Sequence, residues 1–247
     1  MKKKMKPVFI LAGFISLIVS CTTAPEKSSS VQNSLSDTEQ KEGWVLLFDG
    51  VSTNGWHVYN KEKAIKSWTV SNGELVCNAI QDTAKTEVQD LVTDSSYANF
   101  ELVFEWSITT GGNSGVFINV VEQADLPTIW TSGPEFQLLD PLHVDYKDAR
   151  RRSGSLFGFF AAKDSIPEKP AGDWNKGRIV QKNGIVEFFV NDLPTVQQDF
   201  TSPAWRDTIA KTYFKNFPSF GKQTSGHIAL QDWNKGVRFR NIKLRQL

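Results

Sequence analysis

The sequence predicts an all-β protein, an antiparallel sandwich of two sheets with one short helix. Three observations support this fold class. Apolar and polar residues alternate in many short segments, turn-forming Asn and Gly residues separate these segments, and one segment alone has a helical pattern. About 200 residues follow the N-terminal segments, which is the size of one all-β domain.

The first 42 residues are expected to precede this domain. Residues 1–20 place four lysines before a short apolar run, which is typical of a secretory signal peptide, and the run is too short to span a bilayer. The ending at residues 17–21 resembles a bacterial lipobox, in which Cys21 becomes the lipidated first residue of the mature protein. Residues 21–42 are polar and are expected to form a flexible tether, so the predicted domain covers residues 43–247.

These segments predict a location. A lipid on Cys21 would anchor the protein to a membrane of the cell envelope, on the periplasmic or cell-surface side. The alternative is an ordinary signal peptide that leaves Cys21 free. If Cys21 is acylated, Cys77 has no partner for a disulfide, and its apolar neighbours indicate a small buried side chain rather than a reactive thiol.

The strand pattern is clearest in the middle of the chain. Residues 100–108 place five apolar side chains on one face and polar ones on the other, and residues 116–120 repeat this alternation. We expect both strands in one sandwich, with the last strand of the chain beside the first, around residues 44–48. The pair Asn183-Gly184 predicts a type I′ hairpin.

The C-terminal third contains the predicted helix and a second hairpin. Residues 202–215 have the helical pattern, with Pro203 in the first turn. Residues 228–231 and 237–244 are expected to pair as a hairpin, with a bulge near Asn241 where the apolar phase shifts.

Charge and aromatic content narrow the kinds of partner. The net charge is +1 and basic residues are scattered, so the sequence has no electrostatic footprint for nucleic acid. Five of the eight Trp residues stand in apolar or strand-like context and are expected in the core, namely Trp44, Trp56, Trp68, Trp106 and Trp174. Trp130, Trp205 and Trp233 stand in turns or loops and could stack on a sugar ring.

The most informative stretch runs from residue 111 to residue 148. Two strand-like segments there carry polar groups among apolar ones, and burying such groups is costly unless they are paired or used. The polar side chains are Asn113, Ser114, Glu135, Gln137, Asp140 and His143. His227, Gln231 and Asp232 form a second polar set near the C-terminus. The alternative to a functional site is a fully hydrogen-bonded polar network in the core.

Successive blocks of the chain resemble the 3-keto-disaccharide hydrolase domain family, which is common in bacterial lipoproteins. The blocks are GWVLLFDG, GGNSGVFI, GPEFQLLD, LHVDYKDA, KPAGDWNKGRIV, FGKQTSGHIALQD and VRFRNIKL. They occur in the family's order and cover nearly all of residues 44–247. The resemblance implies a concanavalin-like jelly roll and action on 3-keto-glycosides or disaccharides. It leaves open a divalent metal such as calcium, although no dense carboxylate loop marks one.

Cleavage of such a substrate needs specific groups. A ketone at C3 acidifies the hydrogen at C2, so a base can form an enolate that expels the substituent at C1, and water then adds to the enone. We expect Glu135 as the base, Gln137 as a donor to the carbonyl, and Asp140 and His143 completing the site, with His143 as an acid or a metal ligand.

The remaining candidates are expected to bind the substrate. Asn113 and Ser114 lie between glycines, where the backbone can approach a ligand closely. With Gln137, the further candidates for substrate binding are Trp130, His227, Gln231, Asp232 and Trp233.

Three blocks depart from the family pattern. Trp233 replaces a histidine, and Gly158 replaces an aspartate. The segment VEFFVND, which contains Phe188 and Asp192, replaces a block that contains a histidine. These changes favour a rival function, a sugar-binding module of the lectin type without catalysis. A conventional glycosidase with two carboxylates is a third hypothesis, with Glu101, Glu105 or Asp232 as the second carboxylate.

Overall fold

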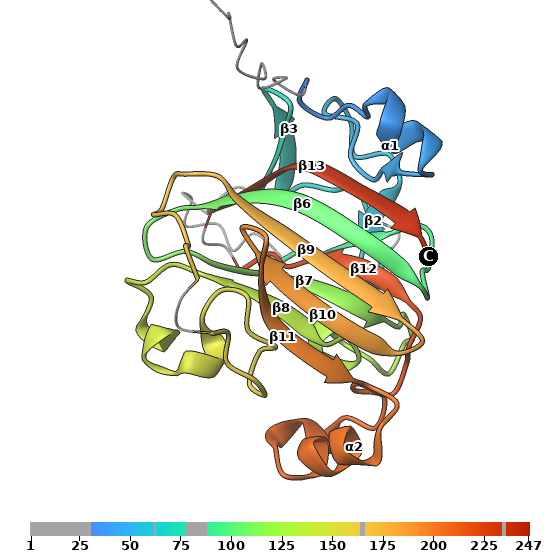
Figure 1. Cartoon of the computed structure of the whole chain (residues 1–247), viewed down its shortest axis with the longest axis vertical. Coiled ribbons are helices and arrows are strands. Elements are labelled where there is room, and N and C mark those ends of the chain that lie inside the picture. The colour runs from blue at the N-terminus through green and yellow to red at the C-terminus, as the bar shows by residue number, and fades with distance from the viewer. Residues whose placement is uncertain (1–30, 62, 78–87, 164–165, 234–235) are drawn as a thin grey trace, which may run out of the picture.

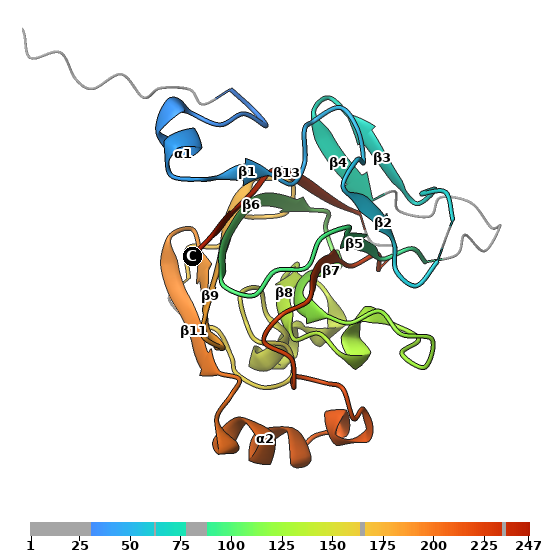
Figure 2. The ribbon, with the colours of Figure 1, turned by 90° about the vertical axis from the view of Figure 1, so that its right-hand side faces the viewer.

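The computed structural model describes residues 31–61, 63–77, 88–163, 166–233 and 236–247. It contains two antiparallel sheets that pack face to face (Figures 1 and 2), so the predicted sandwich is confirmed. The predicted signal peptide and Cys21 lie outside the described residues. Among the residues described, no helix has the length and apolar character needed to cross a membrane.

The larger sheet has eight strands and the smaller sheet has five. The order in the larger sheet is β11 (Leu193–Asp199), β10 (Ile185–Val190), β9 (Asn175–Lys182), β6 (Phe100–Ile108), β13 (Val237–Gln246), β4 (Glu74–Cys77) and β3 (Trp68–Ser71), with β1 (Val45–Leu46) also paired to β13. The order in the smaller sheet is β2 (Trp56–Val58), β5 (Leu91–Thr93), β12 (His227–Leu230), β7 (Asn113–Val120) and β8 (Glu135–Leu139).

The core fills the space between the sheets, as the alternation predicts. All five apolar side chains of the predicted face of β6 are buried there. Phe104 of β6 meets Phe136 of β8 across the sandwich, with ring centroids 5.5 Å apart. Because β7, β8 and β12 direct every second side chain into this core, their other side chains lie on the outer face of the smaller sheet.

Local turn and bulge predictions are confirmed. Asn183 and Gly184 both have positive φ, 52° and 79°, and join β9 to β10 as a type I′ turn requires. Val45 pairs with Leu244, so the last strand does lie beside the first. The register of β13 shifts between Arg240 and Lys243, around Asn241 with φ of 51°.

Two predictions for the C-terminal third are wrong. Strands β12 and β13 do not form a hairpin, because β12 belongs to the smaller sheet and β13 to the larger. Two strands that face one core from opposite sheets show the same alternation as two paired strands. The helix α2 (Pro203–Ala210) is shorter than predicted, because Thr212 caps a separate 3-10 turn at Tyr213–Asn216.

The folded part begins before the predicted boundary at residue 43. Residues 31–42 contact the sandwich instead of forming a free tether, and they include the short helix α1 (Asp37–Lys41). Asn33 and Asn241 exchange two hydrogen bonds between backbone N–H and side-chain oxygen, 2.7 and 2.8 Å long. Glu39 pairs with Lys243. These contacts are polar, so composition alone did not distinguish the segment from a solvated tether.

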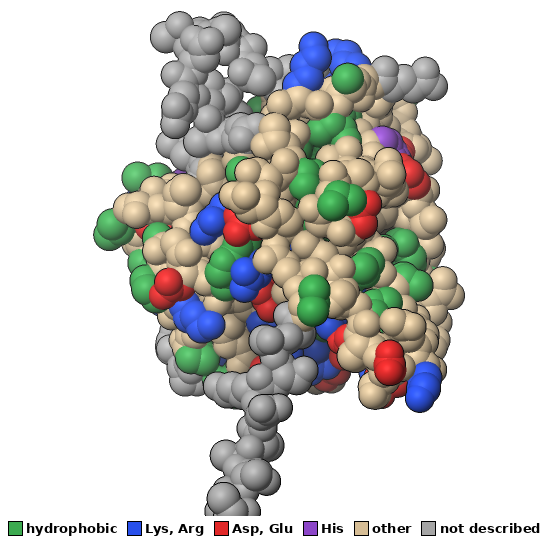
Figure 3. Space-filling model, turned by 90° about the horizontal axis from the view of Figure 1, so that it is seen from above, with side chains coloured by type: hydrophobic (Ala, Val, Ile, Leu, Met, Phe, Trp, Pro, Cys, Tyr) green, Lys and Arg blue, Asp and Glu red, His purple; other side chains and the backbone are tan. Residues whose placement is uncertain are grey.

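The tryptophans mostly follow the prediction. Four are buried as expected, and Trp174 is half-buried with the guanidinium of Arg240 over its ring at 4.0 Å. Trp205 differs from its prediction, because its side chain is fully buried and donates to the carbonyl of Gly221 at 2.8 Å. Cys77 is buried as predicted. On the face seen from above in Figure 3, acidic and basic side chains are intermixed.

Candidate functional site

A cavity of about 340 Å³ lies against the outer face of the smaller sheet. Its size is within the range of small-molecule sites. The loops that follow β7, β8, α2 and β12 surround it. The described residues that line it are Asn113, Trp130, Glu135, Gln137, Asp145, Arg151, Phe157, Tyr213, Phe214, Gln231 and Trp233.

Strand register brings four polar side chains together as the floor of this cavity. Glu135 is paired with Phe117, and Gln137 with Gly115. The N–H of Gln231 donates to the carbonyl of Gly115 at 3.0 Å. Directly opposite residues share one face of a sheet. Therefore Glu135, Gln137 and Gln231 project to the same side, and with Asn113 they form what we call the polar floor.

Glu135 is the most unusual group of the polar floor. Its side chain is only 7% exposed, and no hydrogen bond to it is found within the described part of the chain. It lies flat over Gly115, where an added Cβ would come within 2.1 Å of Oε1. Burial holds the pKa of Glu135 well above 4.5, and the charge of Asp90 raises it further. A carboxyl group in this setting is a candidate acid or base.

The amides of the polar floor present free oxygens. Gln137 donates through Nε2 to Oδ1 of Asn113 at 2.8 Å, which fixes both side chains. The side-chain oxygens of Gln137 and Gln231 are buried and have no hydrogen-bond partner in the described structure. Unpaired buried oxygens are costly, so the floor is suited to accept hydrogen bonds from ligand hydroxyls. The amide of Gln137 is already engaged with Asn113, which differs from the predicted donation to a substrate carbonyl.

Asp90 is a charged group near the site that the sequence analysis missed. It precedes β5 and lies opposite Gln231, because Leu91 pairs with Leu230. Its Oδ1 accepts from the N–H of Asp232 at 2.9 Å, and burial raises its pKa to about 7. The only feature of the sequence that could have indicated Asp90 is its position immediately before an apolar strand. Only the pairing of β5 with β12 shows that it lies near Glu135.

Aromatic side chains form the rest of the cavity. Trp130, Phe157, Tyr213, Phe214 and Trp233 line it, and we call them the aromatic wall. The prediction that Trp130 and Trp233 face a ligand site is therefore consistent with their positions. The two remaining lining residues, Asp145 and Arg151, pair with each other at 3.1 Å.

Five predicted site residues do not line the cavity, and four of them support the local fold near it. Asp140 accepts backbone N–H groups of Gly111 and Leu142 at 2.7 and 3.0 Å. His143 accepts from the N–H of Asp145 at 3.1 Å and caps the turn that follows. The two others point away from the cavity: Ser114 donates to the carbonyl of Gln231, and Asp232 accepts from Cys77 and the N–H of Gln89.

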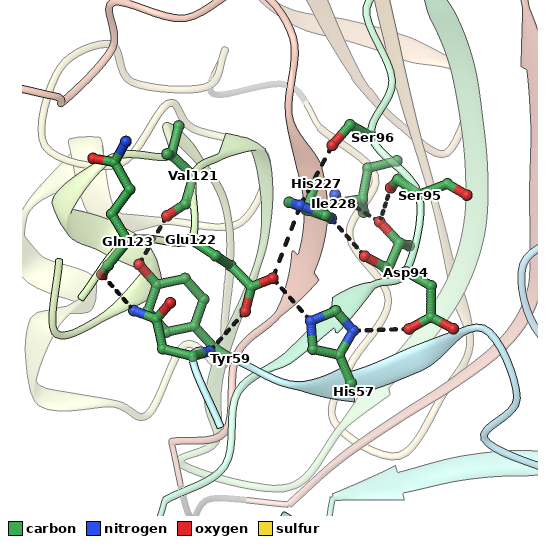
Figure 4. A network of polar contacts seen from close by, with 12 residues as sticks. His57, Tyr59, Asp94, Ser95, Ser96, Val121, Glu122, Gln123, His227 and Ile228 are labelled. Atoms are coloured by element: carbon green, nitrogen blue, oxygen red, sulfur yellow. Dashed lines mark hydrogen bonds and ion pairs between the residues drawn. The ribbon is translucent and has the colours of Figure 1, made fainter. Parts of the chain in front are cut away.

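His227 belongs to a separate polar cluster at the other end of β12 (Figure 4). Its Nδ1 lies 2.6 Å from the carbonyl of Thr93. Beside it, the ring nitrogens of His57 bind Asp94 and Glu122 at 2.8 and 2.9 Å. Glu122 also accepts from the N–H of Asn60 at 2.7 Å. The cluster therefore ties β2 to the loop after β7 rather than facing the cavity.

This cluster predicts a pH dependence of stability. Partial burial lowers the pKa of His57, but the hydrogen bonds to Glu122 and Asp94 outweigh it and raise the pKa above 6.5. Stability from this pairing is complete below pH 6.5 and is lost as the pH rises through the raised pKa. We expect the wild type to exceed His57→Gln in melting temperature at pH 6, and by less at pH 9. An equal difference at both values would contradict this assignment.

A divalent metal such as calcium, which the family resemblance leaves open, stays a hypothesis, because backbone carbonyl and side-chain amide oxygens can also bind this ion. No group of three or more His, Cys, Asp or Glu side chains among the described residues is arranged to hold a metal ion. The two carboxylates that line the cavity have different roles, since Asp145 pairs with Arg151 and Glu135 is unpaired.

The structure is a β-sandwich with a cavity on the outer face of one sheet. The chain belongs to the family of 3-keto-alpha-glucoside-1,2-lyase-like domains, whose model matches residues 43–245. A relative from Bacteroides thetaiotaomicron, named 3-keto-disaccharide hydrolase, is 32% identical over 235 residues. This match covers 83% of this chain and 79% of the relative.

Solved structures support the same fold. The crystal structure of a candidate glycosyl hydrolase from Parabacteroides distasonis is 28% identical, with a TM-score of 0.79, covering 88% of this chain and 100% of that chain. A Bacillus subtilis protein of galectin-like fold is 15% identical, with a TM-score of 0.51, covering 88% of this chain and 95% of that chain. The second likeness shows the fold alone.

The departures from the family pattern differ in their relation to the cavity. Phe188 is buried in the core, against Phe136, and Asp192 pairs with Lys176 on the larger sheet. Gly158 has φ of 76° and stands next to Phe214, the Cε2 of which lies 3.4 Å from where a Cβ would be. Of these departures, only Trp233 lines the cavity, to which it adds an aromatic ring.

Proposed function

We propose that this protein cleaves 3-keto-glycosides by removing the C2 proton, eliminating the C1 substituent and hydrating the resulting enone. The net reaction is hydrolysis, since water adds at C1 and a proton returns to C2. Family membership and the name of the relative support the substrate class. The observation that carries the proposal is Glu135, a buried carboxyl group that lines the cavity and has no hydrogen-bond partner among the residues described.

The polar floor supplies the groups that the reaction needs. Glu135 accepts the C2 proton, and its raised pKa makes its ionised form a stronger base than an exposed glutamate. The side-chain amides of Asn113 and Gln231 can donate to the oxygen that becomes negative in the enolate. Asp145, the other carboxylate that lines the cavity, is paired with Arg151. The departing oxygen at C1 therefore takes its proton from Glu135, which has just received it from C2.

The two rival hypotheses receive less support from the geometry. A binding module gains nothing from an unpaired buried carboxyl group, which costs stability when it ionises. A glycosidase with two carboxylates needs a second free carboxylate across the cavity. Glu101 and Glu105 instead pair with arginines on the larger sheet, and Asp232 lies beneath the cavity.

A substrate panel tests the proposal. Purified protein is incubated with a 3-keto-glucoside and with its unoxidised parent, each with and without divalent metals. We expect cleavage of the oxidised sugar alone. Cleavage of the parent glucoside would contradict the proposal and favour a conventional glycosidase, and binding without any cleavage would favour the binding module.

We also propose that the protein is a lipoprotein of the cell envelope, on the basis of residues 1–21. Labelled palmitate is expected to enter the wild type and not Cys21→Ser when both are expressed in a bacterial host. The reason is that acylation requires the thiol of the lipobox cysteine. Equal labelling of the two proteins would contradict this proposal.

A further inference from the structure

We infer that the aromatic wall binds the leaving group and selects glycosides whose leaving group is aromatic, or similarly flat and apolar. The inference rests on the proposed function, because it assigns the part of the same cavity that holds the group at C1. The polar floor has the donors and acceptors for one sugar ring. The wall has a different chemistry, and it therefore fits a different part of the substrate.

Exposed aromatic rings gather at this cavity. Tyr213 is 65% exposed and Trp233 is 50% exposed, and both line it. A single exposed aromatic side chain needs no explanation, but a group of them at one cavity marks a ligand surface. Binding a flat ring between them would remove this apolar area from water.

Three rings of the wall are also held in place before a ligand binds. Trp130 and Tyr213 both pack edge-on against Phe217, with centroids 4.9 and 5.3 Å away. Phe214 stacks on Phe220 at 4.2 Å, within the buried aromatic cluster around Trp205. A preformed surface loses little conformational freedom on binding.

A second sugar ring would find fewer polar partners at the wall than at the floor, because the wall offers only the hydroxyl of Tyr213 and the indole N–H groups of Trp130 and Trp233. Its hydroxyls would lose water and would need hydrogen bonds in return. Apart from the floor, the charged lining residues are Asp145 and Arg151, which already pair with each other. The guanidinium of Arg151 also lies over the ring of Phe157 at 5.4 Å. An apolar leaving group avoids this desolvation cost.

The test compares 3-keto-glucosides that carry a benzyl, a methyl or a second glucosyl group at C1. Benzyl alcohol and methanol are of similar acidity, so their difference reports binding rather than leaving-group chemistry. We expect kcat/KM for the benzyl substrate to exceed that for the methyl substrate by about 10-fold or more, the contribution of one buried ring. The disaccharide is expected to fall below the benzyl substrate.

Variants locate the effect. Tyr213→Ala and Trp233→Ala should each lower the benzyl-to-methyl ratio by about fivefold or more. Ile185→Ala, which removes an exposed apolar side chain at the start of β10 in the larger sheet, is the control and should keep the ratio. A ratio near one in the wild type, or a ratio unchanged in both wall variants, would overturn the inference.

The outcome separates this inference from the proposed function. Turnover of the methyl substrate without benzyl preference refutes the aromatic wall alone. If no 3-keto-glucoside is cleaved, the proposed function fails, and calorimetric binding of the unoxidised benzyl and methyl glucosides still tests the wall. Tighter binding of the benzyl compound would support it, and equal binding would overturn it.

Discussion

Glu135→Gln is expected to lower the turnover of a 3-keto-glucoside by about 100-fold or more, which corresponds to about 2.7 kcal/mol of barrier. The substitution keeps the shape of the side chain and removes its ability to take a proton. KM should stay within about threefold, because the uncharged parts of the site remain. Steady-state kinetics of wild type and variant measure both quantities. Near wild-type turnover in the variant would place the base elsewhere, with Asp90 as the next candidate.

Although Glu135→Gln is expected to lower turnover, it is expected to raise the stability of the folded protein at pH 8. Folding raises the pKa of Glu135 above 4.5, which favours the protonated carboxyl group. The contribution of this group to stability is therefore fully present below pH 4.5 and is lost as the pH rises through the raised pKa. Glutamine does not ionise. At pH 8 the variant should therefore melt at a higher temperature than the wild type, and this difference should shrink toward pH 4.5. A variant that melts lower at pH 8 would show that Glu135 is a structural residue.

Gly115→Ala is expected to reduce kcat by about 10- to 100-fold while the protein remains folded. An added Cβ would stand 2.1 Å from Oε1 and 2.8 Å from Cδ of Glu135, so the carboxyl group must move. A displacement of about 1 Å can cost that much rate. Gly115 does not have a positive φ, so alanine can adopt its backbone conformation.

A double-mutant cycle isolates the cause of this loss. If Gly115→Ala acts through the position of Glu135, it should have little further effect on turnover in the Glu135→Gln background. Thermal unfolding of each variant confirms that the fold is intact. Independent losses that multiply in the double variant would contradict the proposed role of Gly115.

The pattern along single strands could be predicted from the sequence. Alternation placed Glu135 and Gln137 on one face, and the structure puts both in the polar floor. Closeness in sequence was a weaker guide. Asp140 and His143 follow the same strand, but their side chains accept backbone N–H groups of the turns there. Polar side chains at a strand end are often used in this way.

Pairing between distant strands could not be predicted, and it decides the rest of the site. Asp90 lies near Glu135 only because β5 joins β12, and β12 joins β7, within the smaller sheet. The sequence pattern predicts that Tyr213 and Phe214 belong to a longer helix, but the helix ends before Thr212, and the 3-10 turn that follows places both side chains at the cavity. His227 and Gln231 are close in sequence, yet they belong to opposite ends of one strand and to different clusters.

The central claim is that the C2 carbon–hydrogen bond breaks during cleavage. Its most direct test is to cleave a 3-keto-glucoside in D₂O and to examine the product by NMR after the first turnovers, with product incubated alone under the same conditions as the control. The wild type is expected to form product that carries deuterium at C2, and Glu135→Gln should form almost none. Product from the wild type that keeps its original C2 hydrogen would contradict elimination and would indicate direct hydrolysis at C1.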